Sequence, residues 1–382
     1  MQPAIMPRRL LYILHQYSHL GGAELQTRLL AERVSRSYDV WIAWMDVANK
    51  CAVVQDVLGG KQLRRPTEPV TKIGADETAA EQTLRDILRD FDPDIVHFQQ
   101  ILYWPLRAID IALATRAKVV VSLYDYLTIT PDYAMYGVND PRETFTSAYA
   151  ISRFGTDISG YIAHRRQLLG QSLSRAHKRV VISDQLRRVI TQVYPLDFQV
   201  IEPGIEPFVP LPKTPAPGGL RFGFLGSLIR TKGITTLSQA FLNVRQRYPT
   251  AELRIYGGPI PRGAPPPGMA VPGPYEPNEL PRIFSDFDVG VIPSIFAETY
   301  SIVLSEMWHA KTPVIASRIG AISDRITDGV NGKLVPPENV DALAEAMAWF
   351  IENDSWRQWT MPDVRTADQL AQDHEALYGF LP

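Results

Sequence analysis

Two glutamates, Glu298 and Glu306, lie close together in the segment FAETYSIVLSEMWHAKTPVIAS. The pattern predicts a strand end, a tight turn and a short helix, which the side-chain oxygen of Ser301 or Thr299 can cap. The N-terminus of such a helix presents unpaired N–H groups and a partial positive charge, which suit a phosphate group. A rise of about 1.5 Å per residue places Glu306 roughly a turn and a half further along. The two carboxylates can then contact different parts of one ligand, with a diphosphate between two hydroxyl-bearing groups, as in a sugar nucleotide.

Gly21 and Gly22 form a second candidate phosphate contact. They follow the apolar run LLYIL and open a helical pattern. Because glycine has no Cβ, its backbone N–H can approach a phosphate closely. A glycine pair at a strand-to-helix turn is by itself more often only a turn, so its meaning depends on the other motifs.

The composition is that of an ordinary globular protein. Of the 382 residues, 45% are hydrophobic and 21% are charged, and the length suggests two domains that each bury a core. The net charge of −2 gives no reason to expect nucleic-acid binding. Cys51 is the only cysteine, which excludes a disulfide framework and fits a reducing cytosol. The apolar run Leu10–Leu14 is too short for a signal peptide or a membrane span. We therefore expect a cytoplasmic protein, with any membrane contact peripheral and at the inner face.

Short apolar runs alternate with amphipathic helical patterns along the chain. This alternation indicates parallel sheets in an α/β protein, with strands buried on both faces. The candidate strands are LLYIL, VWIAW, DIVHF, KVVVSL and RVVIS in the first half, and RFGFLG, AELRIYG, DVGVIPS and TPVIAS in the second.

A proline-rich segment divides the two halves. Residues 202–219 contain six prolines and three glycines, which cannot continue a helix or a central strand. The predicted organisation is a Rossmann-like domain at 1–203, a linker at 204–219, a second Rossmann-like domain at 220–354 and a terminal segment at 355–382. Two such domains would face a central cleft with the carboxyl ends of their parallel sheets.

Four motifs in order, GGAE, GSLIRTKG, the glutamate pair and DGVNGKLVPP, resemble those of retaining glycosyltransferases of family four, which have the GT-B fold. The resemblance covers nearly the whole chain and is strongest over residues 221–336. It implies a UDP- or GDP-linked sugar donor bound mainly by the second domain, and an acceptor that enters through the first. The terminal segment is expected to cross back to the first domain. The implied reaction is transfer of a hexose-type sugar, without metal or cofactor, to a hydroxyl of a glycan, lipid-linked or small-molecule acceptor, as in polysaccharide or glycolipid synthesis.

The resemblance also assigns roles to individual residues. Glu298 is expected to contact hydroxyls of the donor sugar, Glu306 to bind the ribose, and Lys232 to neutralise the departing diphosphate. Backbone N–H groups of residues 300–303 are expected to hold the distal phosphate. The expected catalytic residues are Glu298, Lys232, Arg230 and Tyr124, and the expected donor-binding residues are Gly21, Gly22, Gly226, Ser227, Arg230, Lys232, Glu298, Tyr300, Ser301, Ile302, Val303 and Glu306.

The chain departs from the family pattern at several positions. Ser227 stands where an arginine is frequent, and Arg230 is the candidate to replace it. Tyr124 replaces the histidine of a His-Asp-Tyr motif after KVVVSL. Tyrosine can donate a hydrogen bond, but it is a poor base near neutral pH. Lys311 takes the place of a glycine, and Asp324 that of a glutamate. The change at Tyr124 is expected to affect binding and reaction of the acceptor more than binding of the donor.

Three other features have a structural interpretation beside a functional one. His97 ends the strand DIVHF and is more often structural there than functional. Asp286 and Asp288 have the spacing of a metal motif, but we interpret them as a helix end and a strand lead-in, and no metal site is predicted. Between His164 and Arg188, seven basic residues could face anionic lipid, or equally form a solvated helix face. They are Arg165, Arg166, Arg175, Lys178, Arg179, Arg187 and Arg188.

Two other functions fit the same fold. A non-catalytic GT-B protein that binds a sugar nucleotide, or serves as a partner subunit, is favoured by Tyr124 and Ser227. The intact Lys232, Glu298 and Glu306 weigh against it. Another GT-B enzyme, such as a phosphorylase or a nucleotide-sugar epimerase, is the second alternative, although the sequence context of a pyridoxal lysine is not found.

Overall fold

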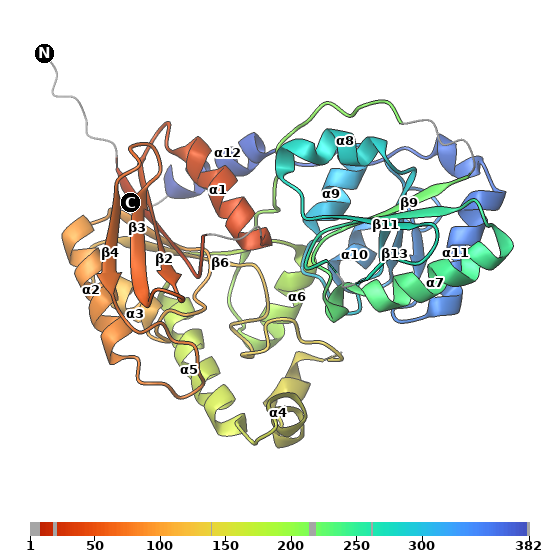
Figure 1. Ribbon diagram of the computed structural model, residues 1–382. Coiled ribbons are helices and arrows are strands. Elements are labelled where there is room, and N and C mark those ends of the chain that lie inside the picture. The colour runs from red at the N-terminus through yellow and green to blue at the C-terminus, as the bar shows by residue number, and fades with distance from the viewer. Residues whose placement is uncertain (1–7, 18–20, 139, 214–218, 261–262, 380–382) are drawn as a thin grey trace, which may run out of the picture. The chain divides into compact units, whose positions relative to one another are not determined.

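The computed structural model describes residues 8–17, 21–138, 140–213, 219–260 and 263–379 (Figure 1). The chain divides into two compact units. Unit 1 comprises Met1–Gly204 and Ala367–Pro382, and unit 2 comprises Ile205–Thr366. Both units are α/β, as the alternating pattern predicts.

Unit 1 contains an eight-stranded sheet with the order β4-β3-β2-β1-β5-β6-β7-β8. Its parallel strands are apolar and largely buried, because helices cover both faces of such a sheet. These strands are β1 (Arg9–Leu14), β2 (Asp39–Asp46), β5 (Ile95–Phe98), β6 (Lys118–Leu123), β7 (Lys178–Val181) and β8 (Gln199–Val200).

Two strands that the sequence pattern did not predict extend this sheet. β3 (Cys51–Asp56) pairs antiparallel with β2, and β4 (Gln62–Pro66) pairs antiparallel with β3, so an antiparallel hairpin adds to the predicted parallel strands. The short connection between β2 and β3 allows only a hairpin, because a parallel pair needs a crossover of about a dozen residues. β4 is mostly exposed and carries Arg64 and Arg65, as is typical of an edge strand.

The helices of unit 1 follow the amphipathic segments. They are α1 (Gly22–Val34), α2 (Thr78–Phe91), α3 (Ala108–Leu113), α4 (Ser147–Phe154), α5 (Ser159–Arg175), α6 (Asp184–Val193) and α12 (Ala367–Gly379), with a 3-10 turn, η1 (Pro141–Phe145).

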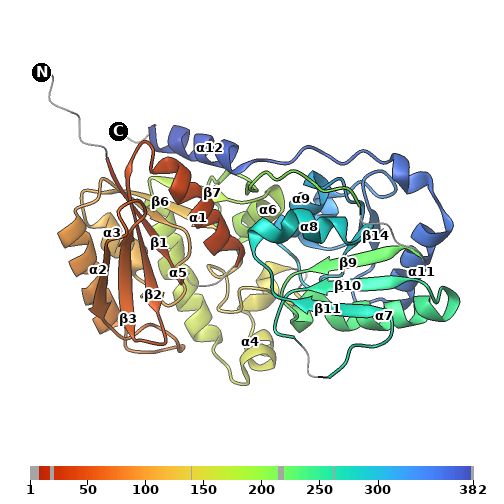
Figure 2. The same cartoon turned by 45° about the horizontal axis from the view of Figure 1, so that its top comes forward.

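The terminal helix α12 packs on unit 1, where Figures 1 and 2 show it alongside α1. Arg33 of α1 forms an ion pair with Asp368 at 2.8 Å. Tyr378 is buried, and its hydroxyl lies 3.0 Å from the Tyr12 hydroxyl and 2.7 Å from His97 Nδ1. These contacts support the structural interpretation of His97.

Unit 2 contains a six-stranded parallel sheet with the order β11-β10-β9-β12-β13-β14. The strands are β9 (Arg221–Leu225), β10 (Glu252–Tyr256), β11 (Met269–Gly273), β12 (Val289–Ile292), β13 (Val314–Ser317) and β14 (Lys333–Val335). The helices are α7 (Ile234–Arg247), α8 (Leu280–Ser285), α9 (Ile302–His309), α10 (Gly320–Arg325) and α11 (Val340–Glu352), with 3-10 turns η2 (Arg230–Lys232), η3 (Pro277–Glu279) and η4 (Ser355–Gln358).

The limits of the units differ from the predicted boundaries at two places. Residues 205–213, predicted as linker, belong to unit 2, because Lys213 Nζ donates to the backbone carbonyls of Phe284 (2.8 Å) and Phe287 (2.7 Å). Residues 355–366, predicted as the start of the terminal segment, also belong to unit 2, where the indole of Trp356 is buried. Within the described ranges, no helix combines the length and apolar character needed to cross a membrane.

Candidate functional site

Lys232 and Glu298 form the centre of the candidate site in unit 2. Lys232 Nζ donates to Glu298 Oε1 at 2.9 Å, and the Glu298 side chain is only 7% exposed. Lys232 ends η2, which follows β9, and Glu298 lies in the loop that follows the neighbouring strand β12. A further hydrogen bond between the two segments, from Ile295 N to Thr231 O at 2.9 Å, keeps them together. The site therefore lies at the carboxyl edge of the sheet, where open α/β sheets bind ligands.

Gly233 makes the approach of these two segments possible. Its φ is +73°, and a Cβ at this position would lie 1.8 Å from the Pro293 carbonyl oxygen. Only glycine fits such a contact without a shift of the backbone. The Lys-Gly pair that the sequence analysis singled out thus has a steric reason as well as an electrostatic one.

Glu298 is ionised in the folded protein. Burial by itself would raise its pKa, but the charge of Lys232 and hydrogen bonds from Ser294, Lys232 and Ser301 lower the pKa below its usual value. Ser294, which was not among the predicted site residues, donates its hydroxyl to Glu298 Oε1. Its position in the apolar strand end DVGVIPS carries no signal of this role.

Glu306 has a contrasting environment on helix α9. Its side chain is buried, and among the described residues it has no hydrogen-bond or ion-pair partner. Burial alone raises the pKa of Glu306 to about 8. The nearby charge of Glu306 also contributes to the raised pKa of Tyr275, after burial. An unpartnered carboxyl group of this kind can accept hydrogen bonds from the hydroxyls of a ligand.

The N-terminus of α9 is not capped as predicted. Ser301 is the N-cap residue, but within the described chain its side chain makes no capping hydrogen bond, and Thr299 precedes the cap position. Ser301 has φ +71°, an unusual conformation for a residue other than glycine. Its hydroxyl instead bonds to Glu298. The first N–H groups of the helix, including those of Ile302 and Val303, therefore have no side-chain cap.

Other predicted donor-binding residues lie along the same edge. Gly226 follows β9 with φ +142° and donates its N–H to Tyr256 O at 3.0 Å. Ser227 and Arg230 are both exposed, two to five residues before Lys232.

A segment after β13 fixes the backbone of Glu298. Ala321 N donates to Glu298 O at 2.8 Å. Gly320 has φ +58°, and a Cβ there would lie 2.5 Å from the same carbonyl oxygen. Arg325, which the sequence analysis did not identify, donates to the backbone carbonyls of Tyr300 and Ser301, both at 2.9 Å.

The predicted residues of unit 1 form a separate group. Gly21 is the N-cap residue of α1, and a Cβ on it would lie 2.2 Å from the carboxylate of Glu24. Glu24 is buried, and its Oε1 lies 3.2 Å from His15 Nε2. Despite burial, hydrogen bonds and the charge of His15 lower the pKa of Glu24. The GGAE motif therefore places a buried carboxylate, and not only glycines, at the end of β1.

Tyr124 is turned toward another side chain of unit 1. Its hydroxyl donates to Gln99 Oε1 at 2.8 Å, and burial raises its pKa, so the phenol stays neutral. The adjacent Asp125 accepts from Gln100 Nε2 at 2.6 Å. Burial raises the pKa of Asp125 to about 6. Asp125 is thus better placed than Tyr124 to exchange a proton near neutral pH.

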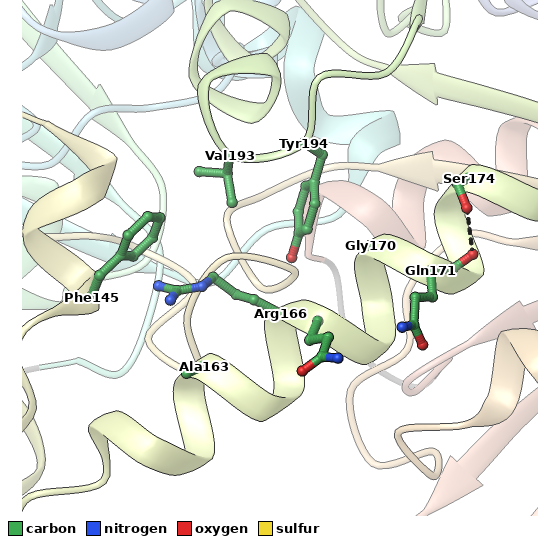
Figure 3. Close-up of a pocket in the computed structure, with 9 residues that line it drawn as sticks. Phe145, Ala163, Arg166, Gly170, Gln171, Ser174, Val193 and Tyr194 are labelled. Atoms are coloured by element: carbon green, nitrogen blue, oxygen red, sulfur yellow. Dashed lines mark hydrogen bonds between the residues drawn. The ribbon is translucent and has the colours of Figure 1, made fainter.

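A pocket of unit 1 is lined by other residues. It has a volume of about 430 Å³ and lies between α5, the end of α6 and Phe145 (Figure 3). The Arg166 guanidinium lies 3.3 Å from the centre of the Phe145 ring, and Tyr194 forms another wall. The lining residues in the described chain include no predicted site residue. This pocket therefore adds no residue to the candidate site.

The basic residues at 164–188 do not form one cationic face. Arg165 is buried and donates to Leu127 O, and Arg179 donates to Asp197 O at 2.9 Å. Arg175 pairs with Asp110 at 3.2 Å, and Arg187 pairs with Asp184. Four of the seven basic side chains thus bind to carbonyl oxygens or carboxylates of the protein itself. The structure gives no support to a lipid-binding surface.

Asp286 and Asp288 have the structural places that the sequence suggested. Asp286 caps the end of α8, and Asp288 precedes β12 and pairs with Arg221 at 3.0 Å. Among the residues that the structure describes, no group of three or more histidine, cysteine or acidic side chains could hold a metal ion.

Comparison with known families accounts for most of the chain. Residues 20–207 match the model of Glycosyltransferase Family 4, and residues 219–353 match that of Glycosyl transferases group 1. Curated relatives include the D-inositol 3-phosphate glycosyltransferases of Corynebacterium urealyticum, 31% identical over 151 residues (35% of each chain), and of Nocardiopsis dassonvillei, 26% identical over 218 residues (49% of this chain and 50% of the other). The matched part thus spans about a third to a half of the length of these relatives.

Solved structures share the fold over nearly the whole chain. Sucrose-phosphate synthase from Thermosynechococcus elongatus aligns with a TM-score of 0.75 and 17% identity, covering 98% of this chain and 99% of the other. HepE from Anabaena, in complex with UDP and glucose, aligns with a TM-score of 0.66 and 15% identity, covering 97% and 99%. At this identity the likeness concerns the fold. With both family models matched in order and the site motifs in place, the chain belongs to the family-four, group 1 glycosyltransferases and has the GT-B fold.

Proposed function

We propose that this protein is a retaining glycosyltransferase that transfers a sugar from a nucleotide diphosphate sugar to a hydroxyl acceptor. One observation carries the proposal: Lys232, ionised Glu298 and the uncapped N-terminus of α9 meet at one edge of the unit 2 sheet. A cation and free N–H groups suit a diphosphate, and a buried carboxylate beside them suits sugar hydroxyls.

The donor is assigned to unit 2. Lys232 and the N–H groups of residues 300–303 contact the diphosphate, Glu298 accepts from the sugar hydroxyls, and Glu306 accepts from the ribose. In the ligand-free protein Glu298 holds Lys232, so an incoming diphosphate competes with Glu298 for this cation. That competition leaves the Glu298 carboxylate available to the sugar. The complexes of HepE with UDP and with UDP-glucose support a uridine donor among the UDP and GDP alternatives.

The proposed reaction needs no enzymatic nucleophile and no metal. The bond between the anomeric carbon and the diphosphate oxygen breaks, and the acceptor oxygen forms its bond to the same carbon on the same face. The departing phosphate takes the proton of the acceptor hydroxyl. Lys232 and the α9 N–H groups stabilise the negative charge that develops on the leaving group.

The acceptor is assigned to unit 1. His15, Glu24 and Asp125 place three titratable groups at the carboxyl ends of β1 and β6, where they can bind hydroxyls. The curated relatives are named for D-inositol 3-phosphate, and a polyol or sugar hydroxyl of a small molecule, a glycan or a lipid-linked glycan is the acceptor class that we propose.

Slow hydrolysis of the donor tests the reaction without knowledge of the acceptor. Proton NMR of the protein with UDP-glucose, GDP-mannose and related α-linked donors, with chelator present, follows the first sugar released. We expect the α-anomer to appear before it mutarotates. Initial release of the β-anomer would contradict retention, and tight donor binding with no release or transfer to any acceptor would favour the non-catalytic alternative.

A further inference from the structure

Arg325, the last residue of α10, holds the turn that leads into α9. Its Nη1 donates to the carbonyl oxygens of Tyr300 and Ser301, both at 2.9 Å. Its Nη2 donates to the Ser305 hydroxyl at 2.7 Å, one turn into the helix. A planar guanidinium with several fixed donors can make these three contacts at once, whereas a lysine ammonium cannot reproduce the geometry.

Two aromatic rings also pack against the guanidinium of Arg325. Its central carbon lies 4.0 Å from the centre of the Tyr300 ring and 5.2 Å from that of Trp308. Both rings are buried. Arg325 therefore joins the turn at 300–301 to the body of α9, and its side chain has little freedom to leave this position.

The two carbonyl contacts determine where the neighbouring N–H groups point. In a trans peptide the C=O of one residue and the N–H of the next lie in one plane and point in opposite directions. Because the Tyr300 and Ser301 carbonyls point toward Arg325, the N–H groups of Ser301 and Ile302 point away from it. These N–H groups belong to the set assigned to the distal phosphate of the donor.

The turn needs such support because its backbone conformation is unfavourable. Ser301 has φ +71° and ψ 87°, which a residue with a side chain rarely adopts. Within the described residues, Ser301 provides no side-chain cap for α9. The contacts of Arg325 with the Tyr300 and Ser301 carbonyls, and not a side-chain cap, hold this turn in place.

We infer that Arg325 is a positioning residue for the donor diphosphate: it keeps the Ser301 and Ile302 N–H groups directed at the distal phosphate. The assignment rests on the proposed function, because it presupposes that this turn binds a diphosphate. Arg325 lies outside the motifs that led to the site, in the stretch GAISDRITDG, and its proposed role is to orient other groups.

A comparison of diphosphate with monophosphate binding tests this role. UMP lacks the distal phosphate of UDP but keeps the base and ribose, and GMP and GDP form the same pair for guanosine. Titration calorimetry measures the dissociation constants of the monophosphate and the diphosphate, either UMP and UDP or GMP and GDP, according to which base the wild type binds. For Arg325→Met we expect the UDP constant to rise about tenfold while the UMP constant stays unchanged. Methionine keeps an apolar stem against Tyr300 and Trp308 but removes the donors.

Two matched variants separate positioning from other effects. Arg318→Met removes an exposed cation that pairs with Asp328 at 2.7 Å, and it should leave the ratio of the two constants unchanged. Arg325→Lys keeps the charge but loses the forked geometry of the guanidinium. Its UDP affinity should therefore recover less than half of the affinity that Arg325→Met loses, on a logarithmic scale. If Arg325→Met does not fold, Ser305→Ala removes only the Nη2 contact and should raise the UDP constant by about twofold to tenfold.

The outcomes that overturn the inference are distinct. A lower melting temperature for Arg325→Met with an unchanged ratio of UDP to UMP affinity would make Arg325 purely structural. Full recovery in Arg325→Lys would mean that charge, and not orientation, matters. If the wild type binds neither UDP nor GDP, the proposed function fails first, and the role of Arg325 fails with it.

Discussion

Lys232 Nζ lies 2.9 Å from Glu298 Oε1, and this pair joins two loops that follow neighbouring strands of unit 2. Burial raises the pKa of Glu298, but the charge of Lys232 and hydrogen bonds lower it below its usual value. Partial burial makes this pair more than a surface salt bridge, and the proposed donor would have to separate its members.

Removal of the lysine should weaken diphosphate binding. We expect Lys232→Ala to reduce affinity for UDP or GDP by about 1.5–3 kcal/mol, the scale of a charge-assisted hydrogen bond. Titration calorimetry measures the change, and Lys61→Ala, at an exposed lysine of unit 1, is the matched control. Equal affinity in the wild type and Lys232→Ala would remove Lys232 from the site.

The protonation of Glu306 should make nucleotide binding depend on pH. Its pKa of about 8 means that much of the ligand-free protein carries a neutral Glu306 at pH 7. If ribose hydroxyls donate to the carboxylate, binding releases a proton, and affinity should rise from pH 6.5 to about 8 and then level off. Glu306→Gln should lose that dependence, and comparison with it removes the effect of phosphate ionisation. Parallel pH profiles for both proteins would contradict the ribose assignment.

The same shift predicts an effect on stability. The folded pKa of Glu306 lies above its ordinary unfolded value, so between about pH 4.5 and 8 the folded state binds more protons. The contribution of Glu306 to stability is therefore present at low pH and is lost as pH rises through about 8. Ligand-free Glu306→Gln should gain stability relative to the wild type over this interval in urea denaturation. A constant difference from pH 5 to 8.5 would show that Glu306 is not buried in its neutral form.

Gly320 should tolerate no side chain. Gly320→Ala places a Cβ 2.5 Å from the Glu298 carbonyl oxygen at φ +58°, so we expect a loss of about 1–3 kcal/mol in unfolding free energy. The control is Gly160→Ala in α5, where a Cβ meets nothing within 4 Å. Denaturant unfolding of both variants provides the comparison. Equal stabilities would mean that the backbone near Glu298 adapts without strain.

The terminal helix should depend on one hydroxyl group. Tyr378→Phe removes hydrogen bonds to Tyr12 and His97 at a buried position and should cost about 1–3 kcal/mol. Tyr133→Phe, at an exposed tyrosine of the same unit, should cost nothing measurable. Thermal unfolding followed by circular dichroism measures both. Identical melting temperatures would indicate that Tyr378 does not stabilise unit 1 through its hydroxyl.

Much of this architecture follows from local patterns in the sequence. Strands such as LLYIL and KVVVSL are apolar on both faces, which only a covered parallel sheet explains, and the amphipathic segments became helices α2 and α11. Strand β4 was missed because QLRRP is an exposed edge strand without the alternation of a half-buried one. Strand β3, CAVVQD, was missed although its first four residues are buried. Edge strands take their conformation from a neighbour, which the sequence pattern does not reveal.

The site divides in the same way. Glu298 and Glu306 could be found from their spacing, because they lie in one loop and the helix that follows it, and Lys232 could be found from the Lys-Gly pair that resembles the family motif. Arg325 could not be found in this way, because it contacts a turn more than 20 residues away in the sequence. Ser294 could not be found either, because its role depends on a contact with the buried Glu298. The prediction of a side-chain cap at Ser301 is wrong, because tertiary contacts hold this residue at positive φ. Local sequence preference does not determine the backbone conformation there. Glu298 and Glu306 are both buried, and their pKa values differ because Glu298 has a charged partner and hydrogen-bond donors, which spacing cannot encode.

Thermal stabilisation by nucleotides is the measurement that shows whether Lys232 and Glu298 form a diphosphate site. The wild type is melted with UDP, GDP, their monophosphates and inorganic phosphate, beside Lys232→Ala and Glu306→Gln. A ligand at about 100 times its dissociation constant adds roughly 2.7 kcal/mol, which gives a clear shift. We expect UDP or GDP to raise the melting temperature more than the corresponding monophosphate does, and to raise it less in both variants than in the wild type. No shift with any nucleotide, or an equal shift in all three proteins, would contradict a diphosphate site at Lys232 and Glu298.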